Sequence, residues 1–209
     1  GNARALRKAL EKRGATLVAV EGNLVDAVWA DQPEPPLGAI EIHPESLAGE
    51  LARDKLTRMA ETVKQAGADF AVLTDPSSLA WTFNIRGADV PHTPLALGFA
   101  LVGSGGRHAI YLDPRKLDIE QRAYLTQLAD LRAPADLESD IATRAVDGGR
   151  VALDPVLVSE KLRLIVEDAG GKVIESPDPA RLPRATKNET ELAGSRAAHR
   201  RDGAAMAKF

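Results

Sequence analysis

A helix-to-strand pattern in the middle of the chain limits the possible folds more than any other feature. Between Leu47 and Ala66, apolar residues recur three or four positions apart, which places them on one face of a long helix that Gly67 ends. These apolar positions are Ala52, Leu56, Met59, Ala60 and Val63. The next segment, Asp69 to Thr74, has little polar alternation, so we expect a strand with both faces covered. A helix that leads into a doubly buried strand indicates an α/β layer.

Further helix and strand patterns alternate downstream. Leu95–Val102 and His108–Leu112 are predicted strands, and the turn Gly103–Gly106 joins them into a hairpin. The remaining predicted elements are helices near Asp118–Ala129, Leu137–Val146 and Ser159–Asp168, and strands at Arg150–Leu153 and Lys172–Glu175. The sequence therefore predicts the α/β class: a mixed, twisted sheet with helices on both faces, between partial flanking domains.

Two proline-rich connectors divide the chain into three predicted parts. Residues 1–44 hold a short amphipathic helix at Asn2–Arg13, a buried strand at Thr16–Val20 and a connector around Pro33–Gly38. Residues 45–177 form the main domain. In residues 178–209, Asn188 is the predicted N-cap of a helix and Glu191 its reciprocal partner. One stripe of that helix is expected to face inward, although the rest of a domain to pack on is missing: Leu192, Ser195, His199, Asp202, Met206 and Phe209.

Charge balance and cysteine content exclude several classes of protein. The 209 residues carry a formal net charge of −3, whereas nucleic-acid-binding surfaces are usually strongly basic. The sequence has no cysteine, which excludes disulfides and thiolate metal sites. No run reaches the roughly 20 apolar residues of a membrane helix, and no apolar signal core follows Gly1. We therefore expect a soluble, cytoplasmic protein with neither nucleic acid nor a membrane as a partner.

Short catalytic and metal-binding motifs are missing from the sequence. It has no His-Glu-x-x-His metal motif and no Gly-x-Ser-x-Gly nucleophile elbow. The turn Gly103–Gly106 lacks the lysine and the following helix of a phosphate-binding loop. His43 is expected at the surface, and His108 is expected to face solvent or to be hydrogen-bonded. His199 and Asp202 lie one helical turn apart, where a helix-packing hydrogen bond is favoured over a catalytic pair. We predict neither catalytic nor metal-ligating residues.

A short helix and a polar loop follow the buried strand. Asp75 is the predicted N-cap and Pro76 the first helical residue. The helix carries the apolar residues Leu79, Ala80, Trp81 and Phe83. The loop then begins at Asn84 and runs to Pro94, so a dense group of polar residues directly follows an apolar segment.

Four residues of this loop are the candidate site: Asn84, Arg86, Asp89 and His92. In a structural interpretation, Arg86 and Asp89 pair locally and Gly87 adopts a positive φ. In a functional interpretation, the permanently charged Arg86 and the titratable His92 point into a cleft and hold a substrate or an adjoining domain. The loop sequence alone leaves both interpretations open.

The same stretch resembles a motif of the Xaa-Pro aminopeptidases (aminopeptidase P) of the long, three-domain type. Leu79–Pro94 matches the pattern Ile-Ala-Trp-x-Phe-Asn-[Ile/Leu]-Arg-Gly-x-Asp-[Val/Ile]-x-x-x-Pro of their second domain. Asn23–Trp29 resembles the exit from their first domain. Lys187–Leu192 together with Arg196–Ala204 resembles the first helix of their catalytic domain. The matches occur in the family's order and span nearly the whole chain.

The resemblance implies a creatinase/prolidase-type N-terminal fold for the middle domain and only the start of a pita-bread catalytic domain. It also implies that two divalent metal ions, often manganese, are held by two Asp, one His and two Glu beyond Phe209, so this chain holds no cofactor. The full-length protein would cleave peptides with proline at the second position, through a metal-bridging hydroxide. The implied partners are those peptides, the chain's own catalytic domain and a second subunit in a homodimer. Because the chain starts at Gly1 without methionine, we interpret it as a piece of a longer protein.

Three hypotheses about function follow. In the first, the chain is a non-catalytic middle segment of a metal-dependent Xaa-Pro aminopeptidase, and Asn84, Arg86, Asp89 and His92 border its substrate cleft. In the second, it is a stand-alone binding or dimerisation module without enzymatic activity. In the third and weakest, it is a complete enzyme in which Arg86, Asp89 and His92 perform acid–base chemistry.

Overall fold

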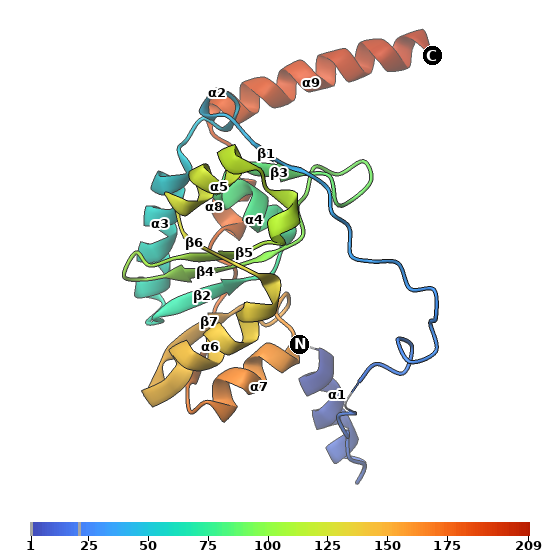
Figure 1. Cartoon of the computed structure of the whole chain (residues 1–209), viewed down its shortest axis with the longest axis vertical. Coiled ribbons are helices and arrows are strands. Elements are labelled where there is room, and N and C mark those ends of the chain that lie inside the picture. The colour runs from blue at the N-terminus through green and yellow to red at the C-terminus, as the bar shows by residue number, and fades with distance from the viewer. Residues whose placement is uncertain (1, 21) are drawn as a thin grey trace.

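The computed structural model describes residues 2–20 and 22–209, and most of them form one layered domain (Figure 1). The elements of this domain and its flanks are, in chain order, α1 (Asn2–Glu11), β1 (Ile40–Ile42), α2 (Glu45–Ala48), α3 (Ala52–Gln65), β2 (Phe70–Leu73), α4 (Pro76–Thr82), β3 (Ile85–Gly87), β4 (Phe99–Gly103), β5 (Ala109–Tyr111), η1 (Pro114–Lys116), α5 (Ile119–Thr126), β6 (Asp130–Arg132), η2 (Pro134–Asp136), α6 (Leu137–Ala145), η3 (Val146–Gly148), β7 (Arg150–Leu153), α7 (Glu160–Asp168), β8 (Lys172–Glu175), α8 (Arg181–Ala185) and α9 (Glu189–Lys208).

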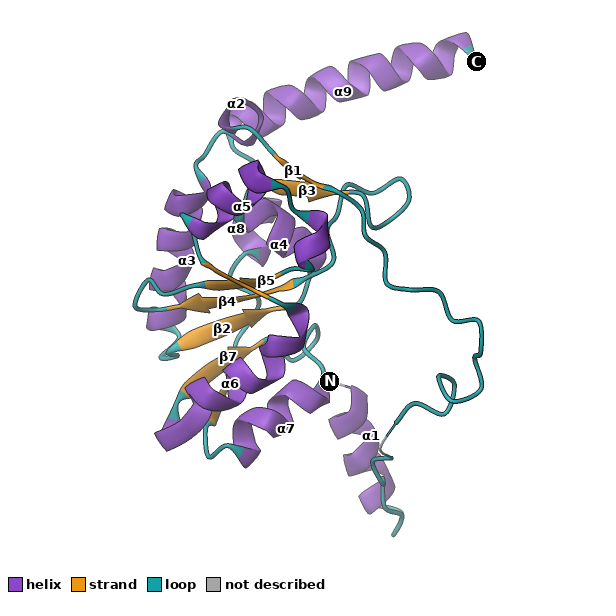
Figure 2. Cartoon of the chain, in the orientation of Figure 1, coloured by secondary structure: helices purple, strands orange, loops and turns teal. Residues whose placement is uncertain are grey.

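A six-stranded mixed sheet lies at the centre of the domain, in the order β6-β5-β4-β2-β7-β8 (Figure 2). Strand β4 runs antiparallel to both of its neighbours, β2 and β5. The pairs β2/β7, β5/β6 and β7/β8 are parallel. The predicted hairpin is therefore confirmed as β4–β5, and the predicted mixed α/β sheet is confirmed with it.

Helices cover both faces of this sheet because the central strands are apolar on both sides. In β2, Ala71 and Leu73 belong to a core that also contains residues of α3, α4 and α5, whereas Phe70 and Val72 belong to a second core with residues of α6 and α7. All four residues of β2 are buried, as its unbroken apolar sequence predicts. The alternation of side chains along a strand explains why one short segment supplies two separate cores.

A small second sheet, β1 paired antiparallel with β3, holds the polar loop next to the first core (Figure 1). The register pairs Glu41 with Arg86. Helix α4 precedes β3 and begins at Asp75, whose carboxylate accepts a hydrogen bond from the backbone N–H of Ser77 (2.9 Å), with Pro76 at the first helical position. The predicted N-cap is confirmed, and it sets the direction in which the chain enters the loop.

The segment between α1 and β1 differs from its prediction. The strand expected at Thr16–Val20 does not form; these residues are irregular, and the Val18 side chain is 73% exposed. A strand leaves its backbone groups unpaired unless another strand lies beside it. No strand of the described chain runs along this segment. Its β-branched residues favour a strand, but they cannot form one without a strand to pair with. From residue 22 to residue 39, the connector forms turns at residues 24–28 and 30–31 and then continues without regular structure to β1 (Figure 1).

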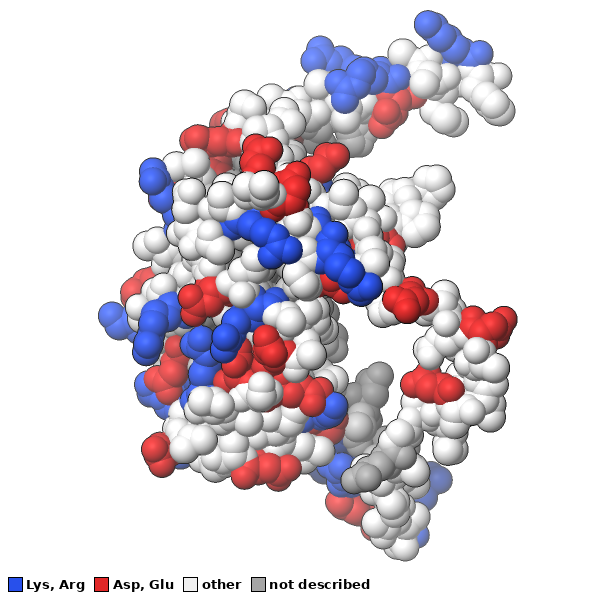
Figure 3. Space-filling model, in the orientation of Figure 1, with Lys and Arg blue, Asp and Glu red and all other residues white. Residues whose placement is uncertain are grey.

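Helix α9 begins on the domain and then leaves it (Figure 1). Its N-terminus forms the predicted capping box: Glu191 N–H donates to Asn188 Oδ1 (2.9 Å), and Asn188 N–H donates to Glu191 Oε2 (2.9 Å). Toward its C-terminus it is exposed, and the Met206 side chain is 74% exposed. Figure 3 shows basic side chains prominent on this helix, whereas acidic and basic side chains mix over the visible face of the domain.

Across the described residues, none of the helices has the combination of length and apolar character that crossing a membrane requires.

Candidate functional site

The loop begins at Asn84, where the backbone turns sharply from α4 into β3. Asn84 adopts a positive φ of 48°, a conformation that asparagine tolerates better than most residues. Its side chain is buried, and its Nδ2 donates to the backbone carbonyl of Glu50 (2.8 Å). Its own carbonyl accepts from the backbone N–H of His43 (2.7 Å). Asn84 therefore connects α4 to the segment around β1.

Lys55, a residue that the sequence interpretation missed, completes the contacts of Asn84. It lies on α3, is only 1% exposed, and its Nζ donates to Asn84 Oδ1 (2.7 Å) and to the Trp81 carbonyl (3.0 Å). The ammonium group also lies 4.2 Å from the centre of the Trp81 ring. Burial lowers the pKa of Lys55 to about 8, although Glu191 and Glu50 oppose this shift. The sequence did contain a signal for this buried residue: Lys55 lies three positions after Ala52, on the apolar face of the helix.

Arg86 is half-buried beside this cluster, and no described residue forms a salt bridge with it. Its Nη1 donates to the backbone carbonyls of Ile85 (2.8 Å) and Ala80 (3.3 Å). The local pair with Asp89 is not formed. Burial lowers the pKa of Arg86, and the nearby carboxylate of Glu191 opposes this effect. A guanidinium has five N–H donors, so most of its hydrogen-bonding capacity remains unused here.

Asp89 has a structural role at the far end of the loop. Its side chain is fully buried and forms a 2.6 Å salt bridge with Lys116 of η1. Its two oxygens also accept from the backbone N–H groups of Gly38 (2.9 Å) and Leu97 (2.7 Å). A Cβ at residue 38 would collide with the backbone of Ala88, so only glycine allows the connector to approach this closely. Asp89 therefore attaches the connector to the loop.

The remaining loop residues differ in their surroundings. His92 is exposed at the tip of the loop and has a positive φ of 61°. Gly87 does not have the positive φ that the structural interpretation gave it; a Cβ there would lie 2.7 Å from the Ala96 side chain, so its role is to allow close approach. The four predicted residues thus divide: Asn84 and Asp89 are buried and satisfied, whereas Arg86 and His92 retain free hydrogen-bonding groups.

Charged groups from three separate elements surround Arg86. Glu191 of α9 accepts a hydrogen bond from Trp81 Nε1 (3.2 Å), which attaches α9 to α4. His43, which follows β1, is half-buried; burial, and then the positive charges of Arg86 and Lys55, lower its pKa. Arg86 and Arg58, whose guanidinium lies 5.8 Å from the centre of the Trp81 ring, both supply positive charge near this junction, and Arg86 keeps N–H donors that no described residue uses. Such a group can bind a carboxylate or a carbonyl oxygen.

The other residues that the sequence offered as candidates for catalysis or metal binding lie outside the polar loop. His199 is exposed, and its Nδ1 lies 2.8 Å from the Ser195 carbonyl; the expected bond to Asp202 is not formed. His108 is buried at 8% exposure, and its Nδ1 has no hydrogen-bond partner, so the expectation that it faces solvent or is satisfied was wrong. In the part of the chain that the structure describes, no group of three or more His, Asp or Glu residues could hold a metal ion.

Comparison with known proteins identifies relatives over the whole chain. A chain described as "Probable Xaa-Pro aminopeptidase P" from Aspergillus flavus is 34% identical over 214 residues, which cover 99% of this chain and 33% of that protein. The protein of the same description from Aspergillus niger is 34% identical over 221 residues, covering 99% and 35%. The chain thus spans about one third of the length of the curated relatives it matches.

Solved structures give the same result. The X-prolyl aminopeptidase from Caenorhabditis elegans, described as a cytosolic enzyme with a di-nuclear active site, matches with a TM-score of 0.89 and 28% identity, covering 100% of this chain and 34% of that one. The Xaa-Pro dipeptidase from Bacillus anthracis, with a TM-score of 0.52 and 17% identity over 68% of this chain and 38% of its own, shares the fold. The family model for the creatinase/prolidase N-terminal domain matches residues 31–191, and the chain therefore belongs to that family.

Proposed function

We propose that this chain is a non-catalytic segment of a cytoplasmic Xaa-Pro aminopeptidase, in which the loop from Asn84 to Pro94 borders the substrate cleft. Likeness along the whole chain to the aminopeptidases of Aspergillus and Caenorhabditis elegans supports this proposal. The observation that carries the role of the loop is Arg86: a half-buried cation without an acidic partner, held at the junction with α9. In this proposal Arg86 and the exposed His92 face the cleft, whereas Asn84 and Asp89 hold the loop in shape.

The chemistry in this proposal belongs to parts of the enzyme that this chain does not contain. Two divalent ions, which we expect to be manganese, would activate the hydroxide that attacks the bond before proline. The described residues offer no cluster of ligands that fits these ions. The proposed contribution of this chain is therefore to orient the peptide, and Arg86 can do so by binding a carbonyl or carboxylate oxygen with two of its N–H groups.

The role of Arg86 is tested in the full-length enzyme with Arg86→Ala and Arg86→Lys. We expect Arg86→Ala to lower kcat/KM for an Xaa-Pro peptide about tenfold or more, because a charged hydrogen bond to substrate is lost. Arg86→Lys should retain only part of the original kcat/KM, because lysine lacks the planar fork of donors. Arg107→Ala, which removes an exposed arginine from the β4–β5 turn, is the matched control. Unchanged kinetics in Arg86→Ala would remove the loop from the substrate site.

The lack of activity is tested with the 209-residue chain itself. Incubated with an Xaa-Pro peptide and added manganese, it should release no N-terminal amino acid. Turnover that a chelator abolishes would contradict the proposal and favour an enzyme complete in these residues.

A second candidate function is a dimerisation module, which exposed apolar side chains outside the domain favour. Val28 is 81% exposed in the connector, and Leu24 and Met206 are also largely exposed. Such side chains commonly mark contacts with another protein surface. Sedimentation of the purified chain tests this candidate: a stable dimer would support it, and a monomer at all concentrations would leave subunit contacts to the rest of the enzyme.

A further inference from the structure

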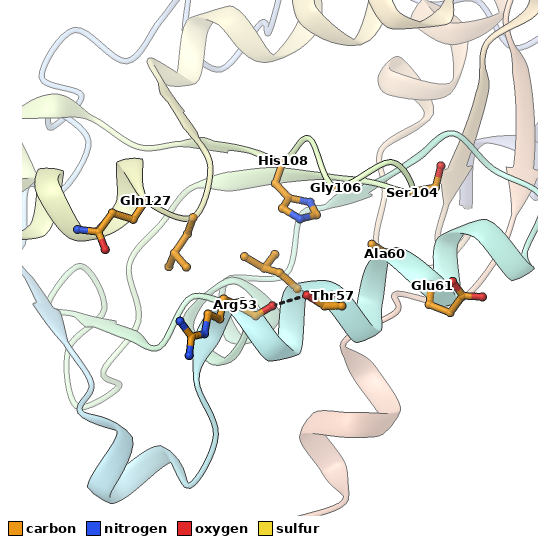
Figure 4. A pocket seen from close by; sticks show the side chains of 10 residues that line it. Arg53, Thr57, Ala60, Glu61, Ser104, Gly106, His108 and Gln127 are labelled. Carbon is orange, nitrogen blue, oxygen red and sulfur yellow. Dashed lines mark hydrogen bonds between the residues drawn. The ribbon is translucent and has the colours of Figure 1, made fainter.

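A hollow of about 380 Å³ lies between α3, the β4–β5 turn and the end of α5, and none of its lining residues belongs to the polar loop (Figure 4). Its volume is within the range of ordinary small-molecule sites. Its polar lining includes Arg53, Thr57 and Glu61 from α3, His108 from the end of the turn, and Gln127 from the residues after α5. Leu56 and Leu128 supply apolar surface between these polar groups.

His108 is the unusual group in this hollow. Figure 4 shows its ring pointing from the turn toward α3, above Thr57. The residue is only 8% exposed, and its Nδ1 has no hydrogen-bond partner among the described residues. Burial lowers the pKa of His108, so the ring is neutral at pH 7 and offers one donor and one acceptor. Because Nδ1 is enclosed by protein, a ligand in the hollow would meet the part of the His108 ring that lines it.

Opposite charges lie at the two ends of the hollow (Figure 4). Arg53 is at one end with Gln127; its side chain is largely exposed, and its one salt bridge is a 3.7 Å contact with the neighbouring Asp54. Glu61 is at the other end, and its Oε1 accepts a 3.3 Å hydrogen bond from Gln65. Both contacts are weak and solvent-exposed, so each charge is available to a ligand.

The spacing of these groups limits what can bind. Glu61 lies eight positions after Arg53 on the same helix, which corresponds to about 12 Å along its axis. An extended peptide advances about 3.3–3.6 Å per residue, so two or three residues reach from one charge to the other once the side chains bend inward. The middle of such a ligand carries peptide N–H and C=O groups, the complement of a neutral imidazole.

We propose that this hollow binds a short zwitterionic peptide of two or three residues, with its carboxylate at Arg53, its peptide groups at His108 and its ammonium group at Glu61. The site is distinct from the polar loop and does not depend on the function proposed for that loop. It requires no chemistry, only complementarity of charge at both ends and of hydrogen bonding between them.

The test is calorimetric titration of the 209-residue chain with trialanine, and with trialanine acetylated at its N-terminus and amidated at its C-terminus. We expect saturable binding of the free peptide and binding at least tenfold weaker for the blocked peptide, because both terminal charges are lost. Arg53→Gln and Glu61→Gln should each weaken binding about tenfold. Lys64→Gln, which removes an exposed charge from the same helix outside the hollow, should leave the affinity unchanged.

The role of His108 needs a separate measurement because a buried residue can affect folding. Resonances of the His108 ring should shift on addition of trialanine in the unaltered chain, and His108→Gln, which keeps a donor and an acceptor, should bind more tightly than His108→Leu. Three results would overturn the proposal: no saturable binding at about 10 mM peptide, equal binding of the blocked peptide, or equal losses in Lys64→Gln and Arg53→Gln.

Discussion

Two lysines are buried at opposite ends of the polar loop, and different groups compensate their positive charges. Lys55 lies under the start of the loop, where its Nζ contacts the neutral oxygens of Asn84 (2.7 Å) and Trp81 (3.0 Å) and the Trp81 ring. Lys116 lies under its end, where its Nζ forms a 2.6 Å salt bridge with the buried carboxylate of Asp89. One ammonium group therefore has only dipoles and a π-face as direct partners, whereas the other has a full negative charge.

The same residue type therefore holds the two ends of one loop in place with two different kinds of charge compensation. Burying an ammonium group is costly unless a charge compensates it. At Lys116 that compensation is local, so the pair depends on both members. At Lys55 the compensation of the buried charge is incomplete, and burial therefore lowers the pKa to about 8. Changes to the two sites should consequently differ in size and in pH dependence.

The largest effect is expected from Asp89→Ala. This change leaves the buried Lys116 without its carboxylate and removes the acceptor of the Gly38 and Leu97 N–H groups. We expect the free energy of unfolding to fall by about 3–5 kcal/mol, as measured by urea denaturation. The double variant Asp89→Asn with Lys116→Met, which removes both charges, should be more stable than Asp89→Ala. If it is not, Asp89 acts mainly through its backbone contacts.

A smaller loss is expected from Lys55→Met. Methionine keeps the apolar part of the side chain but leaves Asn84 Oδ1 without a donor. The free energy of unfolding at pH 7 should fall by about 1–3 kcal/mol, which urea denaturation also measures. Exposed Lys64→Met on the same helix is the control and should change stability little. A loss as large as that of Asp89→Ala would erase the distinction between the two sites.

The two sites should also differ in pH dependence. The pKa of Lys55 is about 8 in the folded protein and 10.5 in its ordinary state, so the unfolded chain binds more protons between these values. The free energy of unfolding of the unaltered chain should therefore rise with pH from about 8 to 10.5, on the order of 1–2 kcal/mol relative to Lys55→Met. Thermal unfolding of both chains across this range measures the difference. Parallel curves would show that Lys55 does not titrate there.

The smallest effect in stability, but the most specific, is expected from Asn84→Asp. It gives Lys55 a carboxylate at the position of Asn84 Oδ1 and so makes this site resemble the one at Lys116. The Lys55 pKa should return toward 10.5, and the pH-dependent gain should disappear. Stability at pH 7 should change by about 1 kcal/mol or less, because the new ion pair is offset by the lost donor to the Glu50 carbonyl, which the second carboxylate oxygen now faces. NMR titration of the Lys55 ammonium group measures this shift. Asn84→Ala, which supplies no charge, should keep the pKa low.

Sequence reasoning succeeded where the pattern was local. The apolar face of α3, the unbroken apolar run of β2 and the caps at Asp75 and Asn188 formed as predicted, because each depends on residues within a few positions of one another. The helix predicted from Leu47 to Ala66 is instead divided into α2 and α3, because Gly49 has a φ of 70° and ends the first of them. It also located the loop from Asn84 onward as a dense polar site.

Predictions from the sequence were wrong where a residue's contact partner lies far away in the chain. Asp89 contacts Lys116 and Gly38 rather than Arg86, and a pairing across 27 or 51 positions leaves no local trace. Thr16–Val20 has the composition of a strand but no neighbouring strand to pair with. His108 was expected at an accessible or satisfied position, yet packing of the turn against α3 buries it.

The α/β class, the order of most elements and the family follow from short segments of sequence, because periodicity, capping residues and the motif around Arg86 are all local. Which polar residues are compensated depends instead on how distant segments pack together. Burial sets the free-energy cost of a charge, and burial depends on all the elements that pack around it. That is why Asn84 and Asp89 became structural residues, why Arg86 kept free donors, and why Lys55 proved central to the loop.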